Sequence, residues 1–203
     1  ILSRCQIFDF KRISVTDAKN YLTEIAKAQG IDAEDDALHI IAQKADGAMR
    51  DALSIFDRVV SYSGNSLTRE AVSKNLNVLD YDVFFKSTSL ILENKIPELL
   101  VYFDEILKNG FDGQHYIAGL ASHFRDLMVC KNPQTIPLLE VGETAKLMYQ
   151  EQSQKCALAF LKESIIIANN CDLNYKLSKN QRLLVELSLM QLASVTFDGA
   201  KKK

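Results

Sequence analysis

Two short segments of the chain carry an arginine in a setting that suits phosphate chemistry. They are Ser3-Arg4-Cys5 near the start and, well downstream, Gly47-Ala48-Met49-Arg50-Asp51-Ala52-Leu53. A guanidinium is planar and permanently charged, and its forked donors match the geometry of a phosphate. The sequence contains no glycine-rich phosphate-binding loop with its lysine. Arg4 and Arg50 are therefore candidates for sensing the terminal phosphate of a nucleotide that other residues bind.

Arg50 is expected in the first turn of a helix, because Asp46 can cap a helix that opens at Gly47. A cation there opposes the helix dipole, which costs about 0.3 to 1 kcal/mol when it is exposed. The free N–H groups of the same helix end attract an anion. Helical spacing predicts an apolar face and an opposite polar face, made respectively of Met49, Leu53, Phe56 and Val60 and of Arg50, Ser54, Asp57 and Ser61. Arg50 is thus expected to project away from its own core.

Both arginines also have simpler interpretations. A surface ion pair with Asp46 or Asp57 would neutralise Arg50, and Arg4 near a terminus would be solvated. Residue chemistry alone favours these simpler roles.

Composition predicts a globular, mostly helical protein. Apolar residues make up 47% of the 203 residues and charged residues 25%, while three prolines and eight glycines leave little room for many tight turns. The net charge of -2 gives no basic footprint for nucleic acid, and Lys201-Lys202-Lys203 is interpreted as a solvated tail. No apolar stretch reaches the roughly 18 to 20 residues of a membrane span. The start lacks a methionine and a signal-peptide plan, so we expect the chain to begin inside a larger cytoplasmic protein.

Helix periodicity and turn residues divide the chain into two groups of helices. Residues 1–13 favour a short extended segment, and four short helices follow within residues 14–76. The first is expected to start at Ser14 or Thr16 and to stop at Gly30, and the second to be capped by Asp32. The third is expected to run from Asp46-Gly47 to about Tyr62, and the fourth from Thr68 to near Leu76. Longer helices are expected over 81–92, 95–109, 113–131, 143–151, 153–171 and 178–196. The last of these is apolar almost all round, which predicts either a central helix or a subunit contact.

The other histidine, cysteine and aromatic residues do not suggest a metal, catalytic or nucleic-acid site. His39, His115 and His123 are too scattered for a metal site, and no nucleophile–base pair is predicted from Ser122, His123 and Cys130. The cysteines form no Cys-x-x-Cys pair, and Cys156 and Cys171 are expected to be reduced core residues. Core packing is also the better interpretation of the aromatic residues of the later helices, which are Phe84, Phe85, Phe103, Phe111, Tyr116, Phe124 and Phe160.

The two arginine motifs resemble a known family. Ser3-Arg4-Cys5, the following Gln6-Ile7-Phe8-Asp9-Phe10-Lys11-Arg12-Ile13, and Gly47 to Ser54 are similar to the bacterial DNA polymerase III gamma/tau subunits. These subunits are the AAA+ ATPase motor of the loader that places the sliding clamp on DNA. The resemblance implies an all-α chain: 1–13 a remnant of the ATPase domain, 14–76 the AAA+ lid, 80–197 a helical collar for oligomerisation, and 198–203 a tail.

By this resemblance, Arg4 is the arginine finger that reaches the γ-phosphate of ATP on a neighbouring subunit. Arg50 is the sensor-2 arginine, which contacts ATP bound to its own subunit. The phosphate loop and the residues that hold Mg²⁺ would precede Ile1, so the chain alone is expected to bind neither ATP nor Mg²⁺ and to have no ATPase activity.

The implied function is support of ATP-dependent loading of a sliding clamp onto primed DNA during replication. Expected partners are other clamp-loader subunits through the collar, and the clamp and primed DNA through the complete complex; no membrane is involved. Two alternatives stay open at this point. One is a nucleotide-independent helical adaptor that binds a partner through its C-terminal helices, and the other is a related clamp-loader subunit that lacks an active ATP site.

Overall fold

The computed structural model describes residues 11–139 and 141–198, which fold into two compact units, with the boundary along the chain between Val78 and Leu79. Within the described residues the chain is almost entirely helical, and the two strands that are present are two residues long. The all-α prediction is confirmed. None of the described helices is long and apolar enough to cross a membrane.

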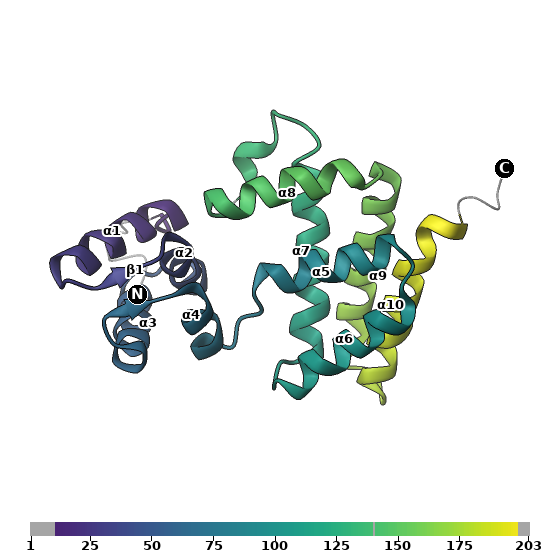
Figure 1. Cartoon of the computed structure of the whole chain (residues 1–203), viewed down its shortest axis with the longest axis horizontal. Helices are drawn as coiled ribbons and strands as arrows, with labels where there is room; N and C mark the ends of the chain where they lie inside the picture. Colours follow the sequence, from purple (N-terminus) through teal and green to yellow (C-terminus); the bar gives the residue numbers. More distant parts are fainter. Residues whose placement is uncertain (1–10, 140, 199–203) are drawn as a thin grey trace, which may run out of the picture. The chain divides into compact units, whose positions relative to one another are not determined.

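The first unit is a small bundle of four helices (Figure 1). These are α1 (Val15–Ala28), α2 (Asp35–Lys44), α3 (Met49–Ser63) and α4 (Arg69–Leu76). Each presents an apolar stripe at helical spacing, and the stripes meet in one core. The largest fully buried side chains of that core are Leu22, Leu38, Ile41, Phe56 and Leu67.

Side-chain caps fix the starts of two of these helices. The Ser14 hydroxyl accepts the N–H of Asp17 at 3.1 Å, which begins α1. The Thr68 hydroxyl accepts the N–H of Ala71 at 3.3 Å and begins α4. Both caps satisfy a backbone donor that the helix itself cannot pair.

The predicted cap of α2 is wrong. Asp32 lies in β1 (Asp32–Ala33), which pairs in parallel with β2 (Ser66–Leu67). The Asp32 N–H donates to the Asn65 carbonyl at 2.9 Å, so the chain is still extended there and the helix starts later. The N-cap position belongs to Glu34, whose carboxylate accepts the N–H of Arg69 at 2.7 Å instead of capping α2.

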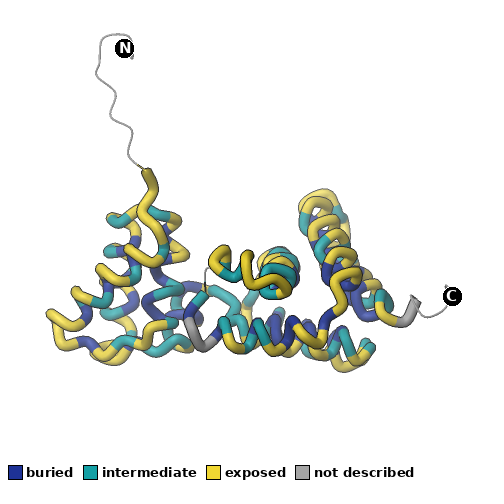
Figure 2. Tube along the Cα trace, turned by 90° about the horizontal axis from the view of Figure 1, so that it is seen from above, coloured by how far each residue is buried: buried dark blue, intermediate teal, exposed yellow. Residues whose placement is uncertain are grey.

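The second unit contains α5 (Tyr81–Leu92), α6 (Ile96–Lys108), α7 (Gly113–Val129), the 3-10 turn η2 (Ile136–Leu138), α8 (Glu143–Lys155), α9 (Leu158–Tyr175) and α10 (Gln181–Asp198). Helix α7 packs along α9, and α9 packs along α10. In each unit the buried residues line the inward sides of the helices (Figure 2).

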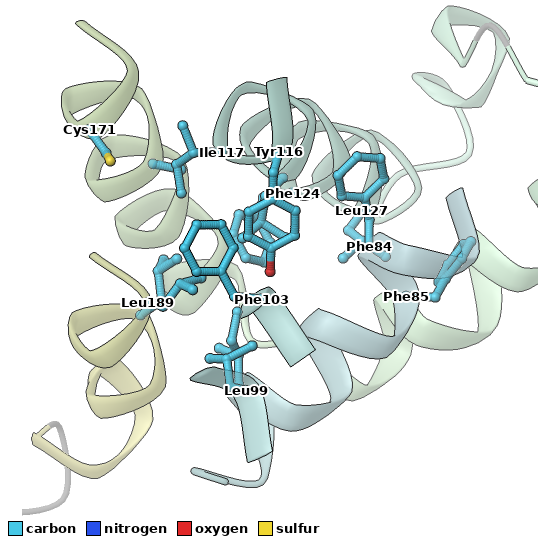
Figure 3. Packing of buried hydrophobic residues seen from close by; sticks show 14 of the residues in the cluster. Phe84, Phe85, Leu99, Phe103, Tyr116, Ile117, Phe124, Leu127, Cys171 and Leu189 are labelled. Atoms are coloured by element: carbon cyan, nitrogen blue, oxygen red, sulfur yellow. The ribbon is translucent and has the colours of Figure 1, made fainter. Parts of the chain in front are cut away.

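Aromatic rings fill the centre of the second unit (Figure 3). The rings of Phe103 and Tyr116 stack with centroids 5.2 Å apart, and the Tyr116 hydroxyl donates to Ser87 Oγ at 2.9 Å. Phe84, Phe85, Phe124 and Phe160 are buried in the same cluster. The interpretation of these side chains as core residues is confirmed.

The predicted break between residues 151 and 153 is wrong, because α8 continues through Lys155 and α9 begins at Leu158. Gln152 and Ser153 are buried within α8. The Gln152 amide donates to the Phe85 carbonyl at 2.8 Å, so its polar group has a partner inside the unit. The sequence prediction thus placed a break between two helices where the structure has a helix interior whose polar side chain is hydrogen-bonded.

The last helix is partly central and partly exposed. Helix α10 packs against α5, α6, α7 and α9 and buries Val185, Leu189 and Leu192. On its outer side Leu183 is 46% exposed and Leu187 is 48% exposed. An apolar face is thus left over after the unit has folded.

Candidate phosphate-sensing site

Arg50 is the second residue of α3 and is exposed. Ser54, Asp57 and Ser61 share its exposed face, while Ala52, Phe56 and Val59 are buried on the other side. Among the described residues, no side chain or carbonyl pairs with the Arg50 guanidinium. The predicted orientation of this helix is confirmed, and the predicted ion pairs of Arg50 with Asp46 or Asp57 do not form within the described part of the chain.

The predicted cap of α3 is also wrong. The N-cap residue is Ala48, which has no side chain able to accept a hydrogen bond. Asp46 has a φ of 46° and directs its carboxylate to Arg12 instead. A carboxylate that is already paired with a guanidinium does not fold back onto the helix end.

The open start of α3 leaves backbone donors without partners. The N–H groups of Asp51 and Ala52 both donate to the Ala48 carbonyl, at 3.1 and 3.0 Å. Within residues 11–139 and 141–198, the N–H groups of Met49 and Arg50 have no hydrogen-bond partner. The positive end of the helix dipole and an unpaired guanidinium therefore lie together, an arrangement that favours a bound anion.

A close contact precedes this helix start, and sequence reasoning missed it. Arg12 binds the carboxylate of Asp46 and donates to its carbonyl at 3.0 Å. The Ile13 N–H donates to the Gly47 carbonyl at 3.2 Å. The segment that enters the first unit is thus joined to the turn before Arg50. The adjacent Asp46-Gly47 was the only available signal, and it indicated a turn without indicating its partner.

The other predicted arginine, Arg4, lies outside the described residues. So do the rest of Ser3-Arg4-Cys5 and most of the segment 1–13 that was predicted to be extended. Those expectations stay predictions.

His123, Cys156 and Cys171 of the second unit are buried in its core. His123 is buried between Tyr149 and Gln152, and burial lowers its pKa to about 4. Burial raises the pKa of the Cys156 thiol to about 11 and also raises that of Cys171, and both are free thiols, as predicted. No group of three metal-ligating side chains comes together in the described part of the chain. The position of His123 in the apolar stripe of Leu120 and Leu127 could have revealed its burial from sequence.

Comparison with known proteins places these features in a family. Residues 17–65 match the family model described as the ATPase lid domain of the DNA polymerase III clamp loader subunit. The chain is 30% identical over 203 residues to DNA polymerase III subunit tau of Bacillus subtilis, covering 98% of this chain and 36% of that protein. It is 24% identical over 194 residues to Protein STICHEL-like 2 of Arabidopsis thaliana, covering 96% of this chain and 22% of that protein. It thus spans about a third or less of these relatives.

Among solved structures, the clamp loader delta protein of Bacillus subtilis has the same fold. The TM-score is 0.52 at 19% identity, over 91% of this chain and 58% of that one. The matched lid segment contains α3 and Arg50, and the relation to the tau subunit extends through the second helical unit. Residues 17–65 thus belong to the ATPase lid family of the DNA polymerase III clamp loader, and nearly the whole chain is similar to the gamma/tau subunits of that loader.

Proposed function

We propose that this chain supports ATP-dependent loading of a sliding clamp by sensing nucleotide through Arg50. The observation that carries the proposal is the exposed Arg50 guanidinium, unpaired within the described residues, at the uncapped start of α3. An exposed cation at the positive end of a helix has no benefit for the fold itself. An anionic ligand would offset that cost by accepting from both the guanidinium and the free backbone donors.

The ligand we propose is the γ-phosphate of ATP bound mainly by an ATPase domain that this chain does not contain. Arg50 would act within its own subunit, and Arg4 would complete the site of a neighbour. An arginine that neutralises the charge of a transferring phosphoryl group contributes on the order of 10³- to 10⁵-fold in rate. Mg²⁺ would be held by the same absent domain together with ATP.

The second unit is proposed to hold clamp-loader subunits together. Its described surface carries exposed leucines on the two C-terminal helices and between them, namely Leu173 on α9, Leu177 after it, and Leu183 and Leu187 on α10. Large apolar side chains in this number on neighbouring helices are typical of a protein contact. The partners are other clamp-loader subunits, and through them the sliding clamp and primed DNA.

The test compares Arg50→Ala and Arg4→Ala in the natural full-length protein, assembled with its partner subunits. Arg50→Ala should weaken ATP binding, because the contact is made in the bound state. Arg4→Ala should leave ATP affinity intact and lower turnover, because a finger acts on the developing charge. The matched control is Arg58→Ala, which removes another exposed arginine from α3.

The same experiment discriminates the adaptor alternative. A nucleotide-independent adaptor would tolerate alanine at both Arg4 and Arg50 with unchanged ATP affinity, turnover and clamp loading. That result would overturn the proposed sensing role and leave only the protein-binding role of the second unit.

A further inference from the structure

The turn between α2 and α3 is built for close approach of another part of the chain. Asp46 and Gly47 have consecutive left-handed backbone angles, with φ of 46° and 78°. A Cβ on Gly47 would lie 2.8 Å from Cβ of Arg12 and 3.0 Å from the carbonyl oxygen of Ile13. Glycine is therefore required at position 47 for two reasons: the left-handed backbone angle, and the lack of space for a Cβ.

Three contacts join the entering chain to this turn. Arg12 binds the Asp46 carboxylate and the Asp46 carbonyl, and the Ile13 N–H donates to the Gly47 carbonyl at 3.2 Å. Because two of the three acceptors are backbone carbonyls, the contacts hold the path of the turn as well as one side chain. We call Arg12, Ile13, Asp46 and Gly47 the entry clamp.

The entry clamp lies immediately before Arg50 along the chain. Only Ala48, the N-cap residue, and Met49 separate Gly47 from Arg50. A rotation of the turn therefore changes the direction of the first turn of α3, and the chain between them is too short to absorb it. The contact with Arg12 also occupies the carboxylate of Asp46, which would otherwise be free to pair with Arg50 or to repel an anion bound there.

We propose that Arg12 is a positioning residue for Arg50, and that the entry clamp couples the phosphate-sensing helix start to the chain that enters this unit. The proposal rests on the proposed function, since it assumes that Arg50 contacts the γ-phosphate. It adds Arg12, which lies outside both arginine motifs, to the residues that affect phosphate binding. It also implies that phosphate binding at Arg50 changes the stability of the contacts made by residues 11–13.

The ion pair of the entry clamp contributes little free energy, because it is exposed to solvent. The side chains of Arg12 and Asp46 are 73% and 81% exposed, and an exposed ion pair of this kind changes an equilibrium by about two- to fivefold. The effect of the clamp on nucleotide affinity should therefore be modest and should shrink as salt is added. The hydrogen bond that Arg12 donates to the Asp46 carboxylate raises the pKa of Arg12, so the guanidinium stays charged at any pH near neutrality.

The test uses the full-length protein in its assembled complex, with ATP affinity and turnover measured separately at low and high salt. Arg12→Ala should raise the Kd for ATP about two- to fivefold at low salt, and Arg12→Lys should restore most of the affinity because it keeps the charge. Lys19→Ala is the matched control, since it breaks the Lys19–Asp35 ion pair between α1 and α2 without touching the clamp. It should leave ATP affinity unchanged.

A second variant reports on the backbone part of the clamp. Gly47→Ala places a side chain in a left-handed conformation and against Arg12, so it should open the clamp and raise the Kd for ATP further, on the order of tenfold. Amide hydrogen exchange at Ile13 should quicken in both Arg12→Ala and Gly47→Ala. ATP should slow that exchange in the wild type and fail to do so in Arg50→Ala.

The outcomes separate the two proposals. If Arg50→Ala weakens ATP binding while Arg12→Ala behaves like Lys19→Ala, the entry clamp has no positioning role and the sensor function stands. If Arg50→Ala itself leaves ATP affinity unchanged, the proposed function is overturned, and the coupling with it. A loss in Arg12→Ala that Arg12→Lys does not restore contradicts the ionic part of the clamp.

Discussion

His123 of α7 donates its Nε2–H to Oε1 of Gln152 on α8 across 2.9 Å in the interior of the second unit. The direction of this bond follows from the partners of the amide. The Gln152 Nε2 group donates to the Phe85 carbonyl at 2.8 Å and to Ser89 Oγ at 3.2 Å, so the other amide atom must be the oxygen, which only accepts. The remaining ring nitrogen, Nδ1, accepts from the Tyr149 hydroxyl at 3.0 Å. One neutral histidine therefore ties α7 to α8, and Gln152 ties α8 to α5.

This network predicts an acid-sensitive second unit. The folded pKa of His123 is about 4, because burial disfavours the charged ring, whereas an unfolded histidine has a pKa near 6.5. Between these values the unfolded state binds the extra proton, so stability is fully present above about pH 6.5 and falls as the pH drops toward 4. The loss attributable to His123 should reach about 3 kcal/mol at the acid end. Denaturant unfolding at pH 4.5 and 7 measures it.

Carboxylates titrate over part of the same window, so the informative quantity is a difference between variants. His123→Gln removes the titrating ring and keeps a polar side chain. It should be less stable than the wild type at pH 7 and should lose less stability on acidification. His115→Gln is the control, because His115 is largely exposed on the same helix. Equal acid slopes for the wild type and His123→Gln would show that His123 does not titrate on unfolding.

The packing of Phe84 against Gly119 predicts that alanine at position 119 destabilises the helix interior, the opposite of the usual effect of replacing a helical glycine by alanine. A glycine inside a helix is usually less favourable than alanine by about 1 kcal/mol. A Cβ on Gly119, however, would lie 2.4 Å from Cζ of Phe84, which is packed in the aromatic core of the second unit. Gly119→Ala should therefore destabilise the unit by about 1 to 3 kcal/mol through overpacking. Ser122→Ala, at an exposed position of the same helix, should be nearly neutral in thermal unfolding.

Sequence reasoning succeeded where a feature depends on one segment. The apolar stripe around Phe56 faces the core and Arg50 faces solvent, as the spacing indicates, and the starts at Ser14 and Thr68 follow from their capping chemistry. The family resemblance rested on motifs that are also local.

The sequence predictions were wrong where a polar side chain has more than one possible hydrogen-bond partner. Asp46 and Asp32 are both good caps by type, yet Asp46 pairs with Arg12 and Asp32 joins β1 to β2. Arg12 is distant in sequence from Asp46, so nothing near either residue records the pairing. In the same way Gln152 belongs to a helix interior only because Phe85 and His123 supply its partners. Tertiary partners decided these cases, and a single sequence does not contain them.

The exposed leucines of α10 predict self-association of the chain, which has a mass of 22.8 kDa. Leu183 and Leu187 lie one turn apart on its outer side, so a partner helix would cover both. Light scattering over a concentration series should give a molar mass that grows above the monomer value. Leu187→Glu should return it to the monomer, because burying a carboxylate in an apolar contact is unfavourable. Ser122→Glu, which adds the same charge at an exposed position of α7, should still associate. A monomer at every concentration would contradict self-association of this chain alone, and it would move the test of Leu187→Glu to the complete complex.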